Sequence, residues 1–201
     1  MPTDAATLPR PRPVVLADLI PDVRVRDAAI VVGAACFVGL LAQVSIPLTP
    51  VPMTGQTLGV VLAGSALGMR RATAALALYA IAGLAGVPWF AGHASGWPGA
   101  LFGYVIGFVV AAAVCGRLAE RRADRRVASS VPTMLLGDVT IFAIGVPWLA
   151  VSYHLTAAEA LASGLTPFLA GEGIKIALAA ALLPATWRLV RAGREERSLP
   201  T

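Results

Sequence analysis

The sequence predicts an all-α membrane protein, a bundle of six transmembrane helices with both termini in the cytoplasm. Hydrophobic residues make up 57% of the 201-residue chain and charged residues only 13%. A soluble domain carries about 25% charged residues. The apolar residues gather in six segments, and the basic residues stand at or beyond the ends of these segments, with Lys175 as the exception. This combination is typical of an integral membrane protein.

The six apolar segments are expected at about residues 27–46, 56–69, 72–87, 99–118, 131–153 and 166–189. A spanning helix needs about 20 residues, so the short second segment is expected to be broken or partly enclosed by the bundle. Pro147 predicts a kink in the fifth helix, and Thr166-Pro167 starts the sixth with a capping residue before proline. The expected organisation is a flexible cytoplasmic tail at 1–26, one membrane domain at 27–190 and a cytoplasmic tail at 191–201.

Arginines determine the predicted orientation. They precede the first segment, separate the second from the third and the fourth from the fifth, and follow the sixth. The other three loops contain neither lysine nor arginine. Because positively charged loops stay in the cytoplasm, both termini are expected there and the three uncharged loops outside.

The uncharged loops are rich in proline and glycine, which predicts fixed turns rather than random coil. The third of them, at residues 153–164, is expected to contain a short interfacial helix. Trp89 and Trp97 in the second loop allow two interpretations. They are either aromatic residues of the membrane interface or the wall of a ligand site.

Glu172 and Lys175 lie inside the sixth segment, three residues apart and therefore on one helix face. At 1.5 Å per residue they are expected about 9 and 13 Å below the outer helix end. They are either an ion pair that joins helices or the polar part of a ligand site open to the outside. Because desolvation cancels much of the attraction in a buried ion pair, the ligand site is favoured.

Asp138 enters the fifth segment from the opposite side of the membrane. It is expected about 10 Å from the cytoplasmic end of that helix. In a hydrocarbon core of about 30 Å it then lies too far away to share a site with Glu172. A packing or hydrogen-bonding role is predicted for it.

Several kinds of chemistry find no support in the chain. The sequence contains no GxxxxGK[ST] motif for ATP. Cys36 and Cys115 lie in apolar segments without CxxC spacing, and His93 and His154 stand in separate loops, so no metal site is expected. The chain is predicted not to be an enzyme and to need no cofactor.

Ala29 and Gly33 form a small-xxx-small pattern on the first segment. Small residues at this spacing allow another helix to approach closely. The partner is either a neighbouring helix of the same bundle or a separate subunit.

Four motifs in this order resemble the BioY family, the biotin-specific S-components of energy-coupling-factor (ECF) transporters. They are Pro47-x-x-Pro-Val-Pro-Met-Thr-Gly-Gln-Thr57, Gly83-Leu-Ala-Gly-Val-Pro-Trp-Phe-Ala-Gly92, Gly103-Tyr-x-x-Gly-Phe108 and Pro167-Phe-x-x-Gly-Glu-x-x-Lys175. The similarity covers about residues 27–190. The sequence departs from the family pattern in three places: Ala100-Leu-Phe102 replaces Pro-Thr-Gly, Glu172 replaces aspartate, and Gly55 replaces the usual leucine.

The resemblance implies a cell-membrane protein that captures biotin from outside and works with a transmembrane T-component and two ATPase subunits. Biotin would be the transported ligand and not a cofactor. Its ureido N–H groups would donate to Glu172, and its ureido oxygen or carboxylate would accept from Lys175. The expected site consists of Glu172, Lys175, Tyr104, Phe90, Trp89, His93, Gln56 and Thr54, with Trp97 beside them and Ala29 and Gly33 as the partner face. The alternatives are a self-sufficient facilitator of a small organic acid and a purely structural membrane subunit.

Overall fold

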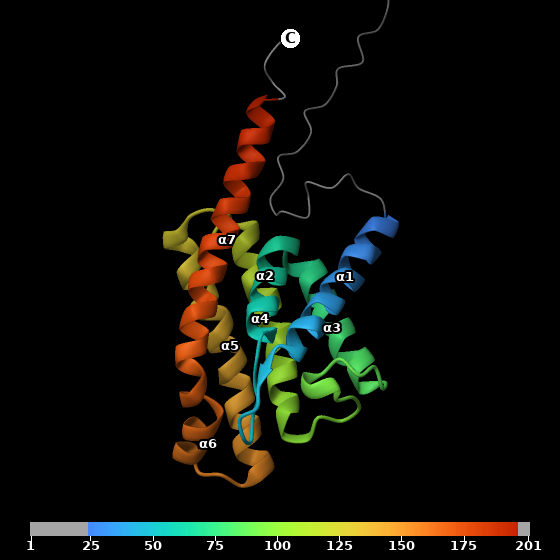
Figure 1. The fold of residues 1–201 in the computed structure, drawn as a ribbon, viewed down its shortest axis with the longest axis vertical. Helices are drawn as coiled ribbons and strands as arrows, with labels where there is room; N and C mark the ends of the chain where they lie inside the picture. The colour runs from blue at the N-terminus through green and yellow to red at the C-terminus, as the bar shows by residue number, and fades with distance from the viewer. Residues whose placement is uncertain (1–23, 197–201) are drawn as a thin grey trace, which may run out of the picture.

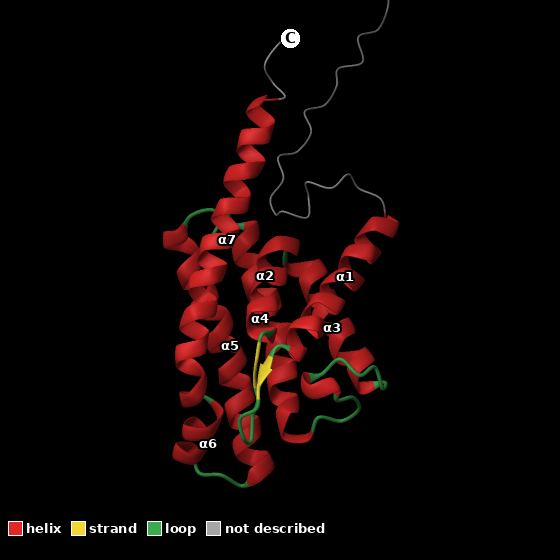
Figure 2. Ribbon diagram, in the orientation of Figure 1, coloured by secondary structure: helices red, strands yellow, loops and turns green. Residues whose placement is uncertain are grey.

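Helices built from the apolar segments run side by side through the whole molecule (Figures 1 and 2). The computed structural model describes residues 24–196, so residues 1–23 and 197–201 of the two predicted tails lie outside the described residues. In chain order the elements are α1 (Arg24–Gln43), β1 (Ser45–Ile46), β2 (Met53–Thr54), α2 (Gln56–Leu67), α3 (Met69–Leu84), α4 (Phe102–Glu120), α5 (Val127–Tyr153), α6 (Ala157–Gly164) and α7 (Leu169–Glu196), with 3-10 turns at Ala91–His93, Gly99–Leu101 and Thr166–Phe168.

Four helical segments of the described chain are long and apolar enough to cross a membrane. They are Val25–Gln43, Gly99–Glu120, Val127–Tyr153 and Ala157–Val190. The helices α2 and α3 are shorter, at 12 and 16 residues. The second segment was expected to be short and enclosed, and most of α2 is indeed buried inside the bundle. The third uncharged loop contains the short helix α6, which begins with a reciprocal capping box formed by Thr156 and Glu159.

The helix α4 lies at the centre of the bundle, in contact with α2, α3 and α5. The helix α1 packs on α3, and α7 packs on α5 and α2. Small residues let these helices approach closely. At Gly107 a Cβ atom would lie 2.9 Å from the carbonyl oxygen of Ile141 on α5, which leaves no room for any side chain.

The two ends of the bundle differ in character. The start of α1, the α2–α3 turn, the α4–α5 loop and the end of α7 all lie at one end (top of Figure 1). These are the arginine-bearing segments. The β1–β2 hairpin, the second loop and α6 lie toward the opposite end. The arginine-rich segments are therefore on one side of the molecule, as the charge pattern predicted.

The predicted separation of Asp138 from Glu172 is wrong. Both residues line the same two cavities between α5 and α7. The helix α5 begins at Val127 rather than near residue 131, which places Asp138 about 17 Å from its start instead of about 10 Å. The helix α7 begins only at Leu169, after α6 and a 3-10 turn, so Glu172 lies in its first turn.

Candidate functional site

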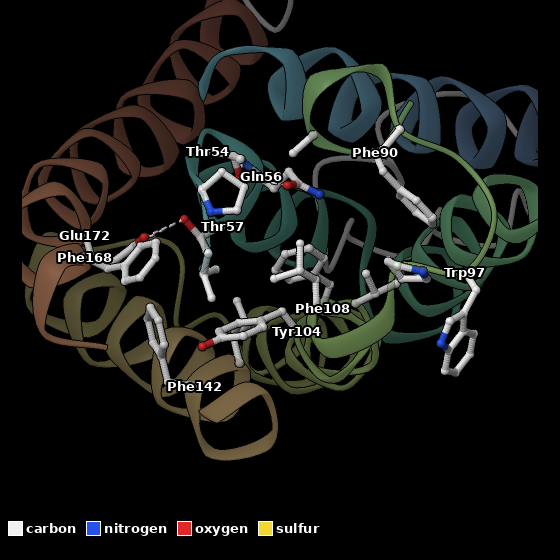
Figure 3. A pocket seen from close by; sticks show the side chains of 18 residues that line it. Thr54, Gln56, Thr57, Phe90, Trp97, Tyr104, Phe108, Phe142, Phe168 and Glu172 are labelled. Atoms are coloured by element: carbon white, nitrogen blue, oxygen red, sulfur yellow. Dashed lines mark hydrogen bonds between the residues drawn. The ribbon is translucent and has the colours of Figure 1, made fainter. Parts of the chain in front are cut away.

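A cavity of about 270 Å³ lies among the first two uncharged loops and the helices α2, α4, α5 and α7. Figure 3 shows how the labelled side chains surround it. Its size is close to the lower end of the range for small-molecule sites, about 300–1,000 Å³. The labelled lining residues are Thr54, Gln56, Thr57, Phe90, Trp97, Tyr104, Phe108, Phe142, Phe168 and Glu172.

Six of the eighteen residues that line the cavity are aromatic. Phe142 meets Tyr104 edge to face, with ring centroids 6.2 Å apart, and lies 5.8 Å from Phe168. The hydroxyl of Tyr104 donates to the carbonyl of Gly164 at 2.9 Å, which fixes this ring between α4 and the end of α6. Gly145 makes the arrangement possible, because a Cβ atom there would lie 2.4 Å from the Tyr104 ring. These contacts form a rigid, flat-sided surface suited to an apolar ring.

One wall of the cavity is polar and is built by three side chains. The hydroxyl of Thr57 donates to both carboxylate oxygens of Glu172, at 3.0 and 2.9 Å. The ammonium group of Lys175 donates to Glu172 Oε1 at 2.8 Å, to Thr57 Oγ1 at 2.9 Å and to the carbonyl of Thr54 at 2.6 Å. An ammonium group has three donors, so all donors of Lys175 are in use.

Lys175 therefore lies behind the polar wall and Glu172 at its surface. The side chain of Glu172 is 6% exposed and lines the cavity, whereas Lys175 does not. By bonding to Thr54, Lys175 ties the end of the first loop to α7. The pair thus joins two elements and also presents a carboxylate to a cavity, which combines the two interpretations that the sequence left open.

A second polar group comes from the start of α2. The hydroxyl of Thr54 donates to Gln56 Oε1 at 2.8 Å, and Gln56 Nε2 donates to the hydroxyl of Tyr79 at 2.8 Å. The Tyr79 hydroxyl in turn donates to the carbonyl of Trp89 at 3.3 Å. The amide of Gln56 is therefore held in one orientation at the cavity wall.

The second loop is held by Gln43 at the end of α1. Gln43 Nε2 donates to the carbonyls of Trp89 and Phe90 at 3.2 and 3.1 Å, and its Oε1 accepts the backbone N–H of His93 at 3.0 Å. Phe90 is thereby placed in the cavity wall, and Trp97 reaches the cavity from the far end of the loop (Figure 3).

Of the eight expected site residues, five line this cavity: Thr54, Gln56, Phe90, Tyr104 and Glu172. Lys175, Trp89 and His93 do not. Trp89 stacks on Tyr79 with centroids 5.3 Å apart and packs against Gly39, so it supports the loop from behind. His93 is exposed and meets Gln43 only through its backbone N–H.

The sequence patterns predicted no role for Thr57, Phe142, Phe168 or Gln43. Thr57 and Phe168 stand inside the motifs quoted above, so their positions carried a signal that was not used. Phe142 and Gln43 carried none, because an aromatic residue in an apolar helix and a glutamine at a helix end are both ordinary.

The expected partner face lies away from the cavity, on α1. Ala29 and Gly33 are exposed, and a Cβ atom at Gly33 would meet nothing within 4 Å. Leu40, two turns further along, is 70% exposed. The described helices therefore leave this stripe of α1 uncovered.

The cavity offers a fixed carboxylate and a fixed amide on one side and aromatic rings elsewhere. Among the described residues, neither lysine nor arginine lines it. It suits a small molecule with an apolar body and N–H groups at one end.

Comparison with known proteins gives a consistent result. Residues 14–192 match the BioY family. A probable biotin transporter BioY of Pyrococcus horikoshii is 31% identical over 153 residues, which cover 72% of this chain and 88% of that protein. Biotin transporter BioY2 of Lactococcus lactis is 34% identical over 152 residues, which cover 74% of this chain and 82% of that one. Biotin transporter BioY of Rhizobium etli is 32% identical over 165 residues, which cover 77% and 86%.

The fold also has a solved counterpart. The crystal structure of the S-component for biotin from an ECF-type ABC transporter superposes with a TM-score of 0.74 and covers 82% of this chain and 92% of that chain. The two sequences are 22% identical, so this likeness bears on the fold.

Proposed function

The chain belongs to the BioY family, and from this premise we propose that it captures biotin from outside and serves in its uptake as the substrate-binding S-component of an ECF transporter. It is a transport protein rather than an enzyme, and biotin is its cargo. No bound cofactor is needed for such a role.

The observation that carries this proposal for the molecule itself is the polarity of the cavity. Biotin has a ureido group with two N–H donors at one end of an apolar, sulphur-containing bicycle. The carboxylate of Glu172 is an acceptor for these donors, and the rings of Tyr104, Phe142 and Phe168 face the apolar body. Charge-assisted hydrogen bonds of this kind are the strong ones.

The positions of the lysine and arginine side chains bear on the orientation of biotin in the cavity. Since neither lysine nor arginine of the described chain lines the cavity, the valerate carboxylate of biotin would point to the open side near Trp97. A direct bond from Lys175 to the ligand would require release of one of its three present hydrogen bonds. We therefore assign Glu172 as the residue that binds the ligand and Lys175 as the residue that holds Glu172 in place.

Titration of biotin into the detergent-purified chain tests the function. The account predicts saturable binding of one biotin per chain. Ala94→Trp, which fills the cavity from the second loop, should abolish this binding, because Ala94 lines the cavity. The neighbouring Ser95 is exposed and does not line it, so Ser95→Trp is the matched control. No binding by the unaltered chain, or equal binding by both variants, would overturn the proposal.

Two biotin analogues test the pose. Methylation of the ureido nitrogens removes the donors to Glu172 and leaves a buried acceptor unpaired. This should weaken binding roughly 5- to 150-fold, from about 1–3 kcal/mol. The methyl ester of biotin changes only the end near the open side and should bind much more tightly than the N-methylated analogue. The opposite order would mean that the carboxylate faces Glu172.

We also propose that six helices, α1 to α5 and α7, cross the cytoplasmic membrane, with both termini inside. The grouping of the arginine-bearing segments at one end supports this orientation. In a chain whose two native cysteines have been replaced, cysteines at Ser95 and Ala158 should react with an impermeant reagent added outside, and one at Ala123 should not. Labelling of Ala123 from outside would reverse the orientation.

The partners follow from the proposed role. The sequence has no ATP-binding P-loop, so the energy for uptake must come from elsewhere. A T-component and two ATPase subunits would supply it. The uncovered stripe of α1 with Ala29 and Gly33 is our candidate for the T-component contact, because its small residues admit close approach of another helix.

A further inference from the structure

Asp138 is a buried carboxyl group with an incomplete set of hydrogen bonds. It lies on α5 one turn before Phe142, whose ring lines the ligand cavity. The residue is 7% exposed, and none of the described residues donates to its Oδ2 atom. A buried polar atom without a partner is costly and rare in native proteins, so this atom needs an explanation.

Glu172 stands between Asp138 and the ligand cavity. It lines three cavities: the ligand cavity, a groove of about 560 Å³ between α5 and α7, and a small cavity of about 10 Å³. Asp138 lines the last two but not the first. The carboxylate of Glu172 therefore has the ligand space on one side and Asp138 on the other.

The small cavity has both polar and apolar groups in its wall. Thr57, Asp138, Glu172 and Lys175 line it together with apolar side chains. A cavity of about 10–15 Å³ with two to four polar partners is what one buried water molecule requires. Its volume of about 10 Å³ is therefore suited to a single water.

The polar groups around this cavity have unused acceptors, which a hydrogen-bond donor could fill. All three N–H donors of Lys175 are already used in hydrogen bonds. The Thr57 hydroxyl donates to Glu172. Asp138 Oδ2 accepts no hydrogen bond, and Glu172 Oε2 accepts only from Thr57 among the described residues. A carboxylate oxygen has two lone pairs. One water can donate to both carboxyl groups at once.

We propose that Asp138 is a positioning residue of the ligand site, which acts on Glu172 through one trapped water. This rests on the proposed function, in which Glu172 accepts from the ligand. The water bridge holds the Glu172 carboxylate at the border of the ligand cavity and keeps it from turning into the groove between α5 and α7. Asp138 thereby contributes to affinity without touching the ligand.

Substitution of Asp138 separates this role from ordinary packing. Asp138→Asn keeps the shape and an acceptor oxygen, so biotin affinity should stay within about threefold. Asp138→Leu removes the acceptor and leaves the water and Glu172 without this partner, so affinity should fall roughly 5- to 150-fold. Thr140→Val on the same helix is the matched control, because its hydroxyl bonds only to the backbone of its own helix. If Asp138→Leu does not fold, Asp138→Ala takes its place.

A second arm measures the link without any ligand. Unfolding midpoints of Asp138→Leu, Glu172→Gln and the double variant in detergent should be clearly non-additive, as for residues of one hydrogen-bond network. Full biotin affinity in stable Asp138→Leu, or additive midpoints, would overturn the proposal. Loss of affinity in Asp138→Asn equal to that in Asp138→Leu would also overturn it. Absence of biotin binding by the unaltered chain would instead reject the proposed function, and the unfolding cycle would still decide on the bridge.

Discussion

At the scale of single residues, Thr57 connects the Glu172–Lys175 pair to the ligand cavity. Its hydroxyl accepts from Lys175 and donates to both oxygens of Glu172. The hydroxyl thus orients the carboxylate toward the cavity, which Thr57 itself lines. Glu172 and Lys175 are recognisable in the sequence because they are charges in an apolar segment. Thr57 is not, because threonine occurs widely in helices and its partners lie more than a hundred positions away.

Substitution of Thr57 tests this role. Thr57→Val keeps the shape but removes the Thr57 partner of one Lys175 donor and of Glu172 Oε2. This should cost about 1–3 kcal/mol, or roughly 5- to 150-fold in biotin affinity. Thr57→Ser keeps the hydroxyl and should bind nearly as well as the unaltered chain. Equal biotin affinities of Thr57→Val and Thr57→Ser, measured by titration, would show that the hydroxyl is dispensable.

Trp89 and His93 show the limit of prediction for residues in loops. Both were expected at the ligand, and neither lines the cavity. Their orientation depends on Gln43, which holds the backbone of the second loop against α1. A hydrogen bond between residues about fifty positions apart leaves no local pattern in the sequence. The loop that contributes to the site was therefore predictable, but the direction of its side chains was not.

At the scale of elements, the α4–α5 loop is locked to α7 at the arginine-rich end. Asp124 is fully buried and accepts from the indole N–H of Trp187, and the guanidinium group of Arg125 lies 4.1 Å from the centre of the same ring. Burial raises the pKa of Asp124 above its ordinary value, and the Trp187 hydrogen bond and Arg125 only partly oppose this. The ionised form is therefore tolerated at a cost.

The sign of the resulting pH dependence is defined. Because the pKa of Asp124 is higher in the folded than in the unfolded chain, the folded chain binds the proton more tightly. This contribution to stability is lost as pH rises from the unfolded pKa of about 4 through the folded pKa. Asp124→Asn should therefore gain in melting midpoint relative to the unaltered chain between pH 4 and pH 7. If the difference in melting midpoint between Asp124→Asn and the unaltered chain did not change with pH, the raised pKa of Asp124 would be contradicted.

The uncovered stripe of α1 leads to a prediction about coupling to a partner. We expect the described bundle to accommodate Gly33→Leu, because a Cβ atom at this position would meet nothing within 4 Å. Purified Gly33→Leu should bind biotin normally but fail in uptake by cells that supply the other subunits, because the leucine blocks close helix approach. Impaired binding, or normal uptake, would place this glycine in the packing of the bundle or at a lipid contact instead.

At the scale of the whole molecule, composition and charge pattern were enough to predict the helical class and the positions of the main segments. Four segments have the length and hydropathy of membrane spans. The relative depth of residues was not predictable. It depends on where helices begin, and α5 begins several residues earlier than the apolar pattern suggests. Asp138 therefore lines the same cavities as Glu172, although its position in the apolar segment predicted a separation of the two residues.

The site as a whole followed from the sequence only in part. Charges in an apolar helix and the motifs of the first loop, the second loop and the start of α4 identified five residues that line the cavity. The aromatic wall from α5 and the order of the polar wall, with Lys175 behind Glu172, depend on how distant segments pack. Neither periodicity nor motif spacing contains that information.

The central claim is that Lys175 and Glu172 serve the ligand and are more than an ion pair between helices. Removal of Lys175 leaves the Glu172 carboxylate short of its charged partner and releases the end of the first loop. Removing one partner of a buried charge pair costs about 2–5 kcal/mol, which corresponds to a loss of roughly 30- to 4,000-fold in affinity.

Titration of biotin into detergent-purified Lys175→Ala, with the melting midpoint recorded on the same sample, tests this claim most directly. The account predicts a folded protein whose biotin affinity is reduced by that factor, with a smaller reduction in Glu172→Gln, which keeps the shape and one acceptor oxygen. Full affinity in a stably folded Lys175→Ala protein would contradict the site described above.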